Sequence, residues 1–150
     1  MKYHLAQLNI SPLKEPIDSP LLSDFVSQLD EINALADAAE GFVWRLQGDE
    51  GNATAYNVFD NEMIIINMSV WESVESLRNY VYKTAHAAVM KQGNKWFGKL
   101  DRPQVVLWWI PAEHIPTPQE AKEKLAYLAK HGETKEAFTF KNIFERVKLD

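Results

Sequence analysis

The stretch that decides the fold is residues 63–97, MIIINMSVWESVESLRNYVYKTAHAAVMKQGNKWF. Its opening residues are apolar except at Asn67 and Ser69 and are rich in β-branched side chains, which predicts a buried strand. Ser73 can cap the helix that follows, and no glycine or proline interrupts that helix before Gly93. The stretch therefore predicts a strand, a tight turn and one long helix.

The residues before this stretch predict two further strands with a helix between them. Tyr3 to Ile10 carries apolar side chains on both of its alternating faces, so we expect both faces of this strand to be covered. The three prolines of the following segment, SPLKEPIDSP, indicate a surface connection. A helix capped by Ser23 or Asp24 then runs to Gly41, and Phe42 to Gln47 forms the next strand.

The residues after this stretch predict one more strand and one more helix. The strand is QVVLWWI, in which the neighbouring Trp108 and Trp109 must point to opposite faces. Thr117 as the N-cap and Pro118 at the first helical position begin a helix that ends near Gly132. The tail, AFTFKNIFERVKLD, keeps apolar side chains, so we expect it to dock against the domain or a partner subunit.

The order of these elements predicts an α+β fold. Strand, helix, strand, strand, helix, strand is the split βαβ order (βαββαβ) of a ferredoxin-like domain, here followed by a C-terminal helix and tail. We expect a single domain over residues 1–150. The two crossover helices hide one face of the sheet, and strands that are apolar on both faces need cover on the other face as well. We therefore expect a second copy to cover that face and form a homodimer.

Composition excludes several classes of function. Sixteen basic against twenty-one acidic residues give a net charge of −5, which disfavours nucleic acid and anionic membranes as partners. Without cysteine there is no disulfide or thiolate metal site, and the four histidines lack the spacing of a zinc site. We find no signal peptide and no apolar run long enough to span a membrane, so we expect a cytoplasmic protein.

Several motifs resemble one protein family over nearly the whole chain. They are YHLAQLNI, GFVWRL, VWESVESLRNYVYKTAH, KWF, VLWWIPA and PTPQEAKEKLAYLAKHGETKEAFTF. Together they resemble the domain-of-unknown-function family 3291. The resemblance implies a dimeric α/β barrel, the fold shared by antibiotic-biosynthesis monooxygenases and haem-degrading monooxygenases. It implies no established activity.

His86 and Asn9 are the candidate catalytic residues. His86 lies off the main apolar stripe of its helix, where a neutral imidazole could act as a base, bind haem iron or hydrogen-bond a substrate. Its KTAH segment is similar to the iron-ligand segment of the haem-degrading monooxygenases, which makes haem a possible cofactor. Asn9 lies where those enzymes carry a functional asparagine, so the resemblance implies that it orients oxygen or substrate. A structural role is the alternative for both residues.

Two groups of residues are candidates for binding a substrate. Arg45 and Asn67 interrupt apolar strands, and their convergence in one cavity would suit an anionic or carbonyl-bearing ligand. The second group is aromatic and could line an apolar pocket for a flat molecule, although most strand aromatics belong to the core. Its members are Trp71, Tyr82, Trp96 and Trp108.

These observations lead to two hypotheses about function. The first is a small-molecule-binding protein that, if it is catalytic, is a monooxygenase-like enzyme acting on an aromatic or polyketide-like substrate or on haem. The alternative is a non-catalytic ligand-binding or interaction module of the same fold. The sequence contains no GxSxG, phosphate-loop or GxGxxG motif, so hydrolases, kinases and dinucleotide-binding enzymes receive no support.

Overall fold

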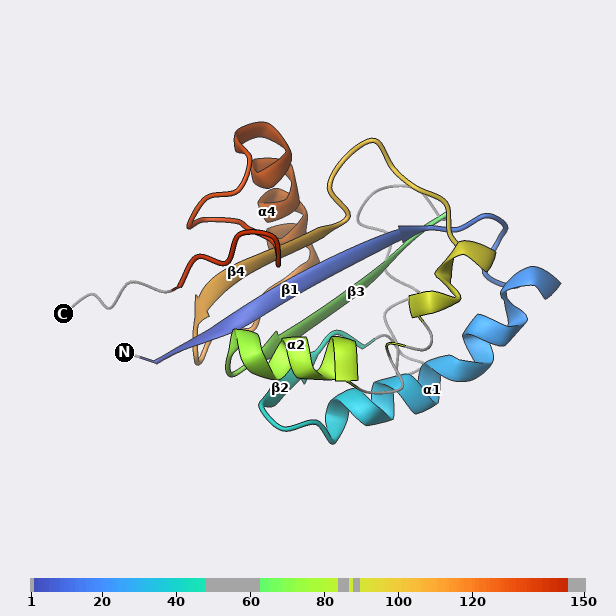
Figure 1. Ribbon diagram of the computed structural model, residues 1–150, viewed down its shortest axis with the longest axis horizontal. Helices are drawn as coiled ribbons and strands as arrows, with labels where there is room; N and C mark the ends of the chain where they lie inside the picture. The colour runs from blue at the N-terminus through green and yellow to red at the C-terminus, as the bar shows by residue number, and fades with distance from the viewer. Residues whose placement is uncertain (1, 48–62, 84–86, 88–89, 146–150) are drawn as a thin grey trace.

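The computed structural model describes residues 2–47, 63–83, 87 and 90–145 (Figure 1). The strands are β1 (Tyr3–Pro12), β2 (Phe42–Arg45), β3 (Ile64–Trp71) and β4 (Val105–Pro111). The helices are α1 (Ser23–Asp37), α2 (Val74–Lys83) and α4 (Pro118–His131), with short 3-10 turns at Pro20–Leu22 and Gly93–Lys95.

The four strands form one sheet in the order β2-β3-β1-β4. Every neighbouring pair is antiparallel, and β1 lies in the centre between β3 and β4. This order, with α1 joining β1 to β2 and α2 joining β3 to β4, is the ferredoxin-like arrangement. The predicted fold class is thereby confirmed.

The structure confirms two of the three predicted helix caps. Ser73 Oγ accepts a hydrogen bond from the Ser76 amide (3.0 Å), and Thr117 Oγ1 accepts one from the Glu120 amide (3.1 Å). The cap predicted at Ser23 or Asp24 is wrong. Ser23 is already helical, because the turn Pro20–Leu22 leads directly into α1, and its hydroxyl donates to the Pro20 carbonyl instead.

The register of β1 and β3 decides which side chains share a face of the sheet. Leu5 lies opposite Trp71, and Asn9 lies opposite Asn67. The apolar side chains of this face pack against α1 and α2, where Ala36 and Leu77 join Leu5 and Trp71 in one buried cluster. This face also carries Gln7, Asn9, Asn67 and Ser69, and we call it the amide face.

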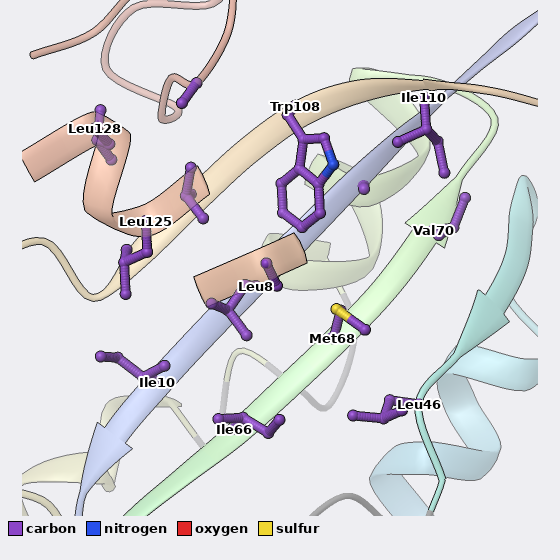
Figure 2. Packing of buried hydrophobic residues seen from close by; sticks show 14 of the residues in the cluster. Leu8, Ile10, Leu46, Ile66, Met68, Val70, Trp108, Ile110, Leu125 and Leu128 are labelled. Atoms are coloured by element: carbon purple, nitrogen blue, oxygen red, sulfur yellow. The ribbon is translucent and has the colours of Figure 1, made fainter. Parts of the chain in front are cut away.

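The opposite face of the sheet is apolar and buried within one chain. Leu125 and Leu128 of α4 belong to the same buried cluster as Leu8 and Trp108, and Figure 2 shows these side chains around the helix and the sheet. On β3, Met68 is buried on this face as well. The predicted second copy is therefore not needed to hide this surface, and the homodimer stays a prediction.

The segment after α4 docks as the sequence predicted, on the amide face. Phe138 is fully buried and exchanges two backbone hydrogen bonds with Leu107 of β4 (2.7 and 3.0 Å). Trp109 donates its indole N–H to the Phe144 carbonyl (2.8 Å). Trp108 and Trp109 thus lie on opposite faces, as expected from their neighbouring positions.

Gly41 lies where α1 turns into β2 and approaches the start of α2. Its φ is +82°, a left-handed conformation that side chains with a Cβ rarely adopt. A Cβ at this position would lie 2.5 Å from Ser76 Cβ and would overlap the Ser76 hydroxyl. Gly132, after α4, also has a positive φ of +74°, but open space surrounds it.

Tyr80 fastens α2 to α1. Its hydroxyl donates to the Ile32 carbonyl (3.1 Å), and its ring stacks on Trp71 with centroids 5.1 Å apart. Burial raises the pKa of the Tyr80 hydroxyl from 10.0 to about 12, the nearby Arg45 cation lowers it, and the Asp37 carboxylate adds to the rise. The neutral form of Tyr80 is therefore the form that the fold stabilises.

We expect Gly41→Ala to destabilise the fold more than Gly132→Ala does. Both substitutions place a Cβ at a positive φ, and strain of this kind costs roughly 1–3 kcal/mol. Only Gly41→Ala adds a clash with Ser76, so its loss of unfolding free energy should be larger by about 1–3 kcal/mol. Urea unfolding of both variants measures the difference, and equal losses would contradict the close approach of this turn to α2.

Tyr80→Phe should change the alkaline stability of the protein. An unfolded tyrosine ionises near pH 10 and Tyr80 in the fold only near 12, so the folded state keeps its full stability below pH 10 and loses roughly 2 kcal/mol as the pH rises to about 12. The variant lacks this loss, but at about pH 8 it should be less stable by about 1 kcal/mol because the bond to Ile32 is gone. Urea unfolding at about pH 8 and at about pH 12 measures these two effects. Tyr127→Phe, on the exposed side of α4, is the control and should behave like the wild type at both pH values.

Candidate functional site

A cavity of about 250 Å³ lies between α1 and the amide face of the sheet. Its walls are mainly apolar, with Phe25, Leu29 and Ile32 from α1 on one side and Ile65 from β3 on the other. The residues that complete the lining are Asn9, Ser11, Gln28, Asn33, Arg45, Leu46, Ile66, Asn67, Met68, Met90, Gly93 and Phe97.

Aromatic packing holds the α1 wall of the cavity in place. Phe25 meets Phe97 edge-on with centroids 5.0 Å apart, and it contacts Trp96 at 5.5 Å. Trp96 is buried behind this wall, together with Leu13 and Leu22. Edge-to-face pairs of this kind add to the apolar burial of their rings, so the wall is rigid where a ligand would touch it.

Two asparagines lie side by side on the sheet side of the cavity. Asn9 of β1 and Asn67 of β3 are directly opposite in the register, so their side chains emerge on the same face. Within the part of the chain that the structure describes, the side chain of Asn9 makes no hydrogen bond, and that of Asn67 makes one, through its oxygen. Both amides therefore offer hydrogen-bonding atoms to a molecule in the cavity.

A chain of hydrogen bonds runs from Asn67 into the core. Gln7 donates through Nε2 to Asn67 Oδ1 (2.8 Å) and to Ser69 Oγ (2.8 Å), and Trp71 donates through its indole N–H to the same Ser69 Oγ (2.8 Å). Gln7, Ser69 and Trp71 are all buried, whereas Asn67 is exposed. The polar atoms of this face are thus linked to one another rather than scattered.

Arg45 brings a positive charge to the cavity, but the charge is partly neutralised. Its Nε lies 2.7 Å from Asp37 Oδ1 and its Nη2 lies 3.3 Å from Asp37 Oδ2, which is a two-point contact. Asp37 ends α1, and Arg45 ends β2. The pair ties these elements together and leaves the cavity without a strong net charge.

The structure brings together three of the predicted site residues. Asn9, Arg45 and Asn67 line the one cavity, although no observation tests their role in binding. His86 lies outside the described residues, so its predicted role as a base or iron ligand stays a prediction.

The four predicted aromatic residues do not line this cavity. Trp71 and Trp96 are buried in the core, and Trp108 faces α4, where its indole N–H donates to Glu120 (3.0 Å). Tyr82 lies on an exposed part of α2 beside Phe140 and borders a separate shallow groove. The three tryptophans are buried in the core. The aromatic residues that line the cavity are Phe25 of α1 and Phe97.

Sequence reasoning missed Gln7 and the α1 wall. Gln7 is on the same strand face as Asn9, so the alternation of β1 already placed them together, but a buried glutamine gives no sign of its partners. Phe25 and Leu29 formed part of the apolar stripe of α1. Periodicity identifies such a stripe and does not tell which part of it borders a cavity.

The cavity shows no fit to haem in the described part of its lining. Its volume is below the roughly 300–1,000 Å³ of sites for drug-sized ligands, and no histidine, cysteine or tyrosine occurs among its described lining residues. In the described part of the chain, no group of three or more histidine, aspartate or glutamate side chains could hold a metal ion.

Comparison with known proteins gives a family and a set of distant structures. A comparison with curated proteins gives no match. Among solved structures, a conserved protein from Methanosarcina mazei Go1 is 10% identical, with a TM-score of 0.52 over 71% of this chain and 90% of that chain. SnoaB, a cofactor-independent oxygenase from Streptomyces nogalater, is 12% identical, with a TM-score of 0.49 over 75% and 95%. NE2512, a protein of unknown function from Nitrosomonas europaea, is 14% identical, with a TM-score of 0.47 over 77% and 95%.

Identities this low speak only for the fold. The family model is more specific, because it matches residues 4–150 and so covers nearly the whole chain. Its description is "Domain of unknown function (DUF3291)". The chain therefore belongs to the DUF3291 family, as the sequence motifs predicted.

Proposed function

We propose that the protein binds a small, mostly apolar molecule with one polar group in the cavity between α1 and the sheet. The observation that carries this proposal is the pair of amides, Asn9 and Asn67, with uncommitted hydrogen-bonding atoms on the sheet side of a mainly apolar cavity. A few polar groups that converge within apolar walls are typical of small-molecule sites.

The shape of the cavity supports a ligand of one or two rings. Phe25 and Phe97 offer flat apolar surfaces, and Leu29 and Ile32 extend the same wall along α1. A volume of about 250 Å³ suits a compact molecule better than an extended one. An aromatic ligand would bury its rings against this wall and turn its polar group toward the sheet.

The charges around the cavity favour a neutral ligand. Arg45 is the one charged residue among the described residues of the lining, and Asp37 already pairs with it. An anion would have to compete with that carboxylate, whereas a neutral group needs only the amides. The anionic ligand that the sequence left open is therefore the weaker alternative.

Binding has more support than catalysis. The oxygen-dependent reaction that the sequence suggested assigned His86 as the base or ligand and Asn9 as the orienting residue, and these roles stay predictions. The described residues of the lining include no carboxylate or imidazole that could act as a base. Without such a group, the amides can orient a ligand but cannot take a proton from it.

Two further expectations stay outside this proposal. The helix α4 covers the second face of the sheet within one chain, so this face does not require a partner subunit. The homodimer stays an expectation from the sequence. The cytoplasmic location stays an expectation from the sequence. Among the helices that the structure describes, none is long and apolar enough to cross a membrane.

A cavity-filling variant should abolish binding. We choose α-tetralone as the probe, because it combines two fused rings with one carbonyl group, and we expect it to bind in the millimolar range. The methyl resonance of Met90 reports on the cavity because this residue lines it. It should shift when the probe is added to the wild type and should not shift in Leu29→Trp, whose indole would occupy the cavity.

Val26→Trp is the matched control for this experiment. Val26 is an exposed residue of α1 and lies outside the cavity lining, so this variant should bind the probe as the wild type does. The proposal is wrong if the wild type shows no methyl shift up to the solubility limit of the probe, or if Leu29→Trp responds as strongly as Val26→Trp.

A further inference from the structure

We infer that the cavity selects a ligand whose polar group accepts a hydrogen bond, because Gln7 holds Asn67 with its amide N–H groups toward the ligand. The inference rests on the proposed function and makes it more specific. It assigns Asn67 as the contact that determines specificity, and Gln7 as a positioning residue that acts through Asn67.

The direction of the hydrogen-bond chain follows from the chemistry of its members. An indole N–H can only donate, so Ser69 Oγ must accept from Trp71. Gln7 Nε2 has two hydrogens, and two acceptors lie 2.8 Å from it, Ser69 Oγ and Asn67 Oδ1. Both hydrogens of Gln7 Nε2 and the indole hydrogen of Trp71 thus have acceptors, and Asn67 receives its hydrogen bond through the oxygen of its amide.

The reversed orientation of the Gln7 amide is much less favourable. Reversal would place Oε1 near Ser69 and Asn67 and would turn both N–H groups to where Oε1 now lies. Within the described residues, Oε1 makes no hydrogen bond, so no acceptor waits there for those two hydrogens. A buried donor without an acceptor costs about 1–3 kcal/mol, and a bare carbonyl oxygen is tolerated more readily.

The core keeps this chain fixed at its inner end. Trp71 is fully buried between Tyr80, stacked at 5.1 Å, and Phe42, which meets it edge-on at 5.5 Å. Gln7 and Ser69 are more than nine-tenths buried. The chain is therefore anchored in the core and ends at an exposed amide that borders the cavity.

The orientation of Asn67 determines the class of the ligand. Because Oδ1 is engaged by Gln7, the planar amide presents Nδ2 and its hydrogens on its other side. A ketone, ester or amide carbonyl can accept from Nδ2, whereas an ammonium group, which can only donate, cannot. Since the charge of Arg45 is paired with Asp37, a neutral carbonyl fits better than a carboxylate.

Two matched probes test this inference. α-Tetralone carries a carbonyl group, and tetralin has the same fused-ring skeleton without the oxygen. The wild type should bind the ketone about tenfold more tightly, because one hydrogen bond distinguishes the two probes. Dissociation constants come from titration of the Met90 methyl resonance. The chemical shifts of the side-chain amide protons of Asn67 should change when the ketone is added and should not change when the hydrocarbon is added.

Variants of Asn67 and Gln7 separate positioning from a merely structural role. Asn67→Asp replaces the donor by a carboxylate, so the ketone should lose most of its advantage while tetralin still binds. Gln7→Met removes the donor that orients Asn67, so the ratio of the two affinities should fall several-fold. Leu13→Val, a buried change directly after β1 and outside the cavity lining, should leave the ratio unchanged because a packing defect weakens the binding of both probes alike.

The outcomes distinguish this inference from the proposed function. If the wild type binds both probes equally, or if Asn67→Asp keeps the preference for the ketone, the inference is overturned while the binding site stands. If the wild type binds neither probe, the proposed function fails as well. Should Gln7→Met not fold, Asn67→Asp decides the question alone, because Asn67 is exposed and its substitution leaves the core intact.

Discussion

The antiparallel register between β1 and β3 is the constraint on which the rest of the structure depends. It pairs Leu5 with Trp71, Gln7 with Ser69 and Asn9 with Asn67. On this face, each side chain thus lies opposite one of similar polarity. Because side chains alternate along a strand, a shift by one residue would move all of them to the other face. The buried cluster around α2, the hydrogen-bond chain and the cavity therefore all follow from one alignment.

The same alternation gives the sheet two apolar faces, and the chain covers both. On the amide face the apolar end, around Leu5 and Trp71, lies under α2 and the segment that contains Phe138. Toward Asn9 and Asn67 the face becomes polar, and there the packing against α1 leaves a cavity. On the other face Ala6, Leu8 and Ile10 of β1 are apolar, and α4 packs over this face. The cavity lies where the polarity of the strands makes close packing unfavourable.

Local patterns predicted the fold well, because they express local physics. The strand at Ile64–Trp71, the caps at Ser73 and Thr117, and the order of the elements follow from alternation, capping and turn residues. The position of α4 could not be predicted, since an apolar stripe shows that a helix is buried without telling which surface buries it. Two apolar faces of a sheet therefore do not tell whether a helix of the same chain or a second subunit covers the second face.

The candidate site was predictable only in part. Polar interruptions in apolar strands pointed to Asn9, Arg45 and Asn67, because a buried polar group needs a reason. The large aromatic residues gave no such information, since a tryptophan in a strand packs equally well in a core and in a pocket. Gln7 shows a further limit, because its importance lies in which of its atoms are already bonded. Only the coordinates give that information.

A site of this kind can discriminate through its polar end more sharply than through its shape. In the absence of a ligand, the exposed amide of Asn67 can be hydrated, so its free N–H groups cost little. A ligand that enters the cavity removes this water. If it carries an acceptor, the hydrogen bond is restored, and if it does not, a buried donor is left unpaired. The penalty for the wrong ligand therefore exceeds the gain from one extra apolar contact, because apolar walls distinguish molecules only by small differences in contact area.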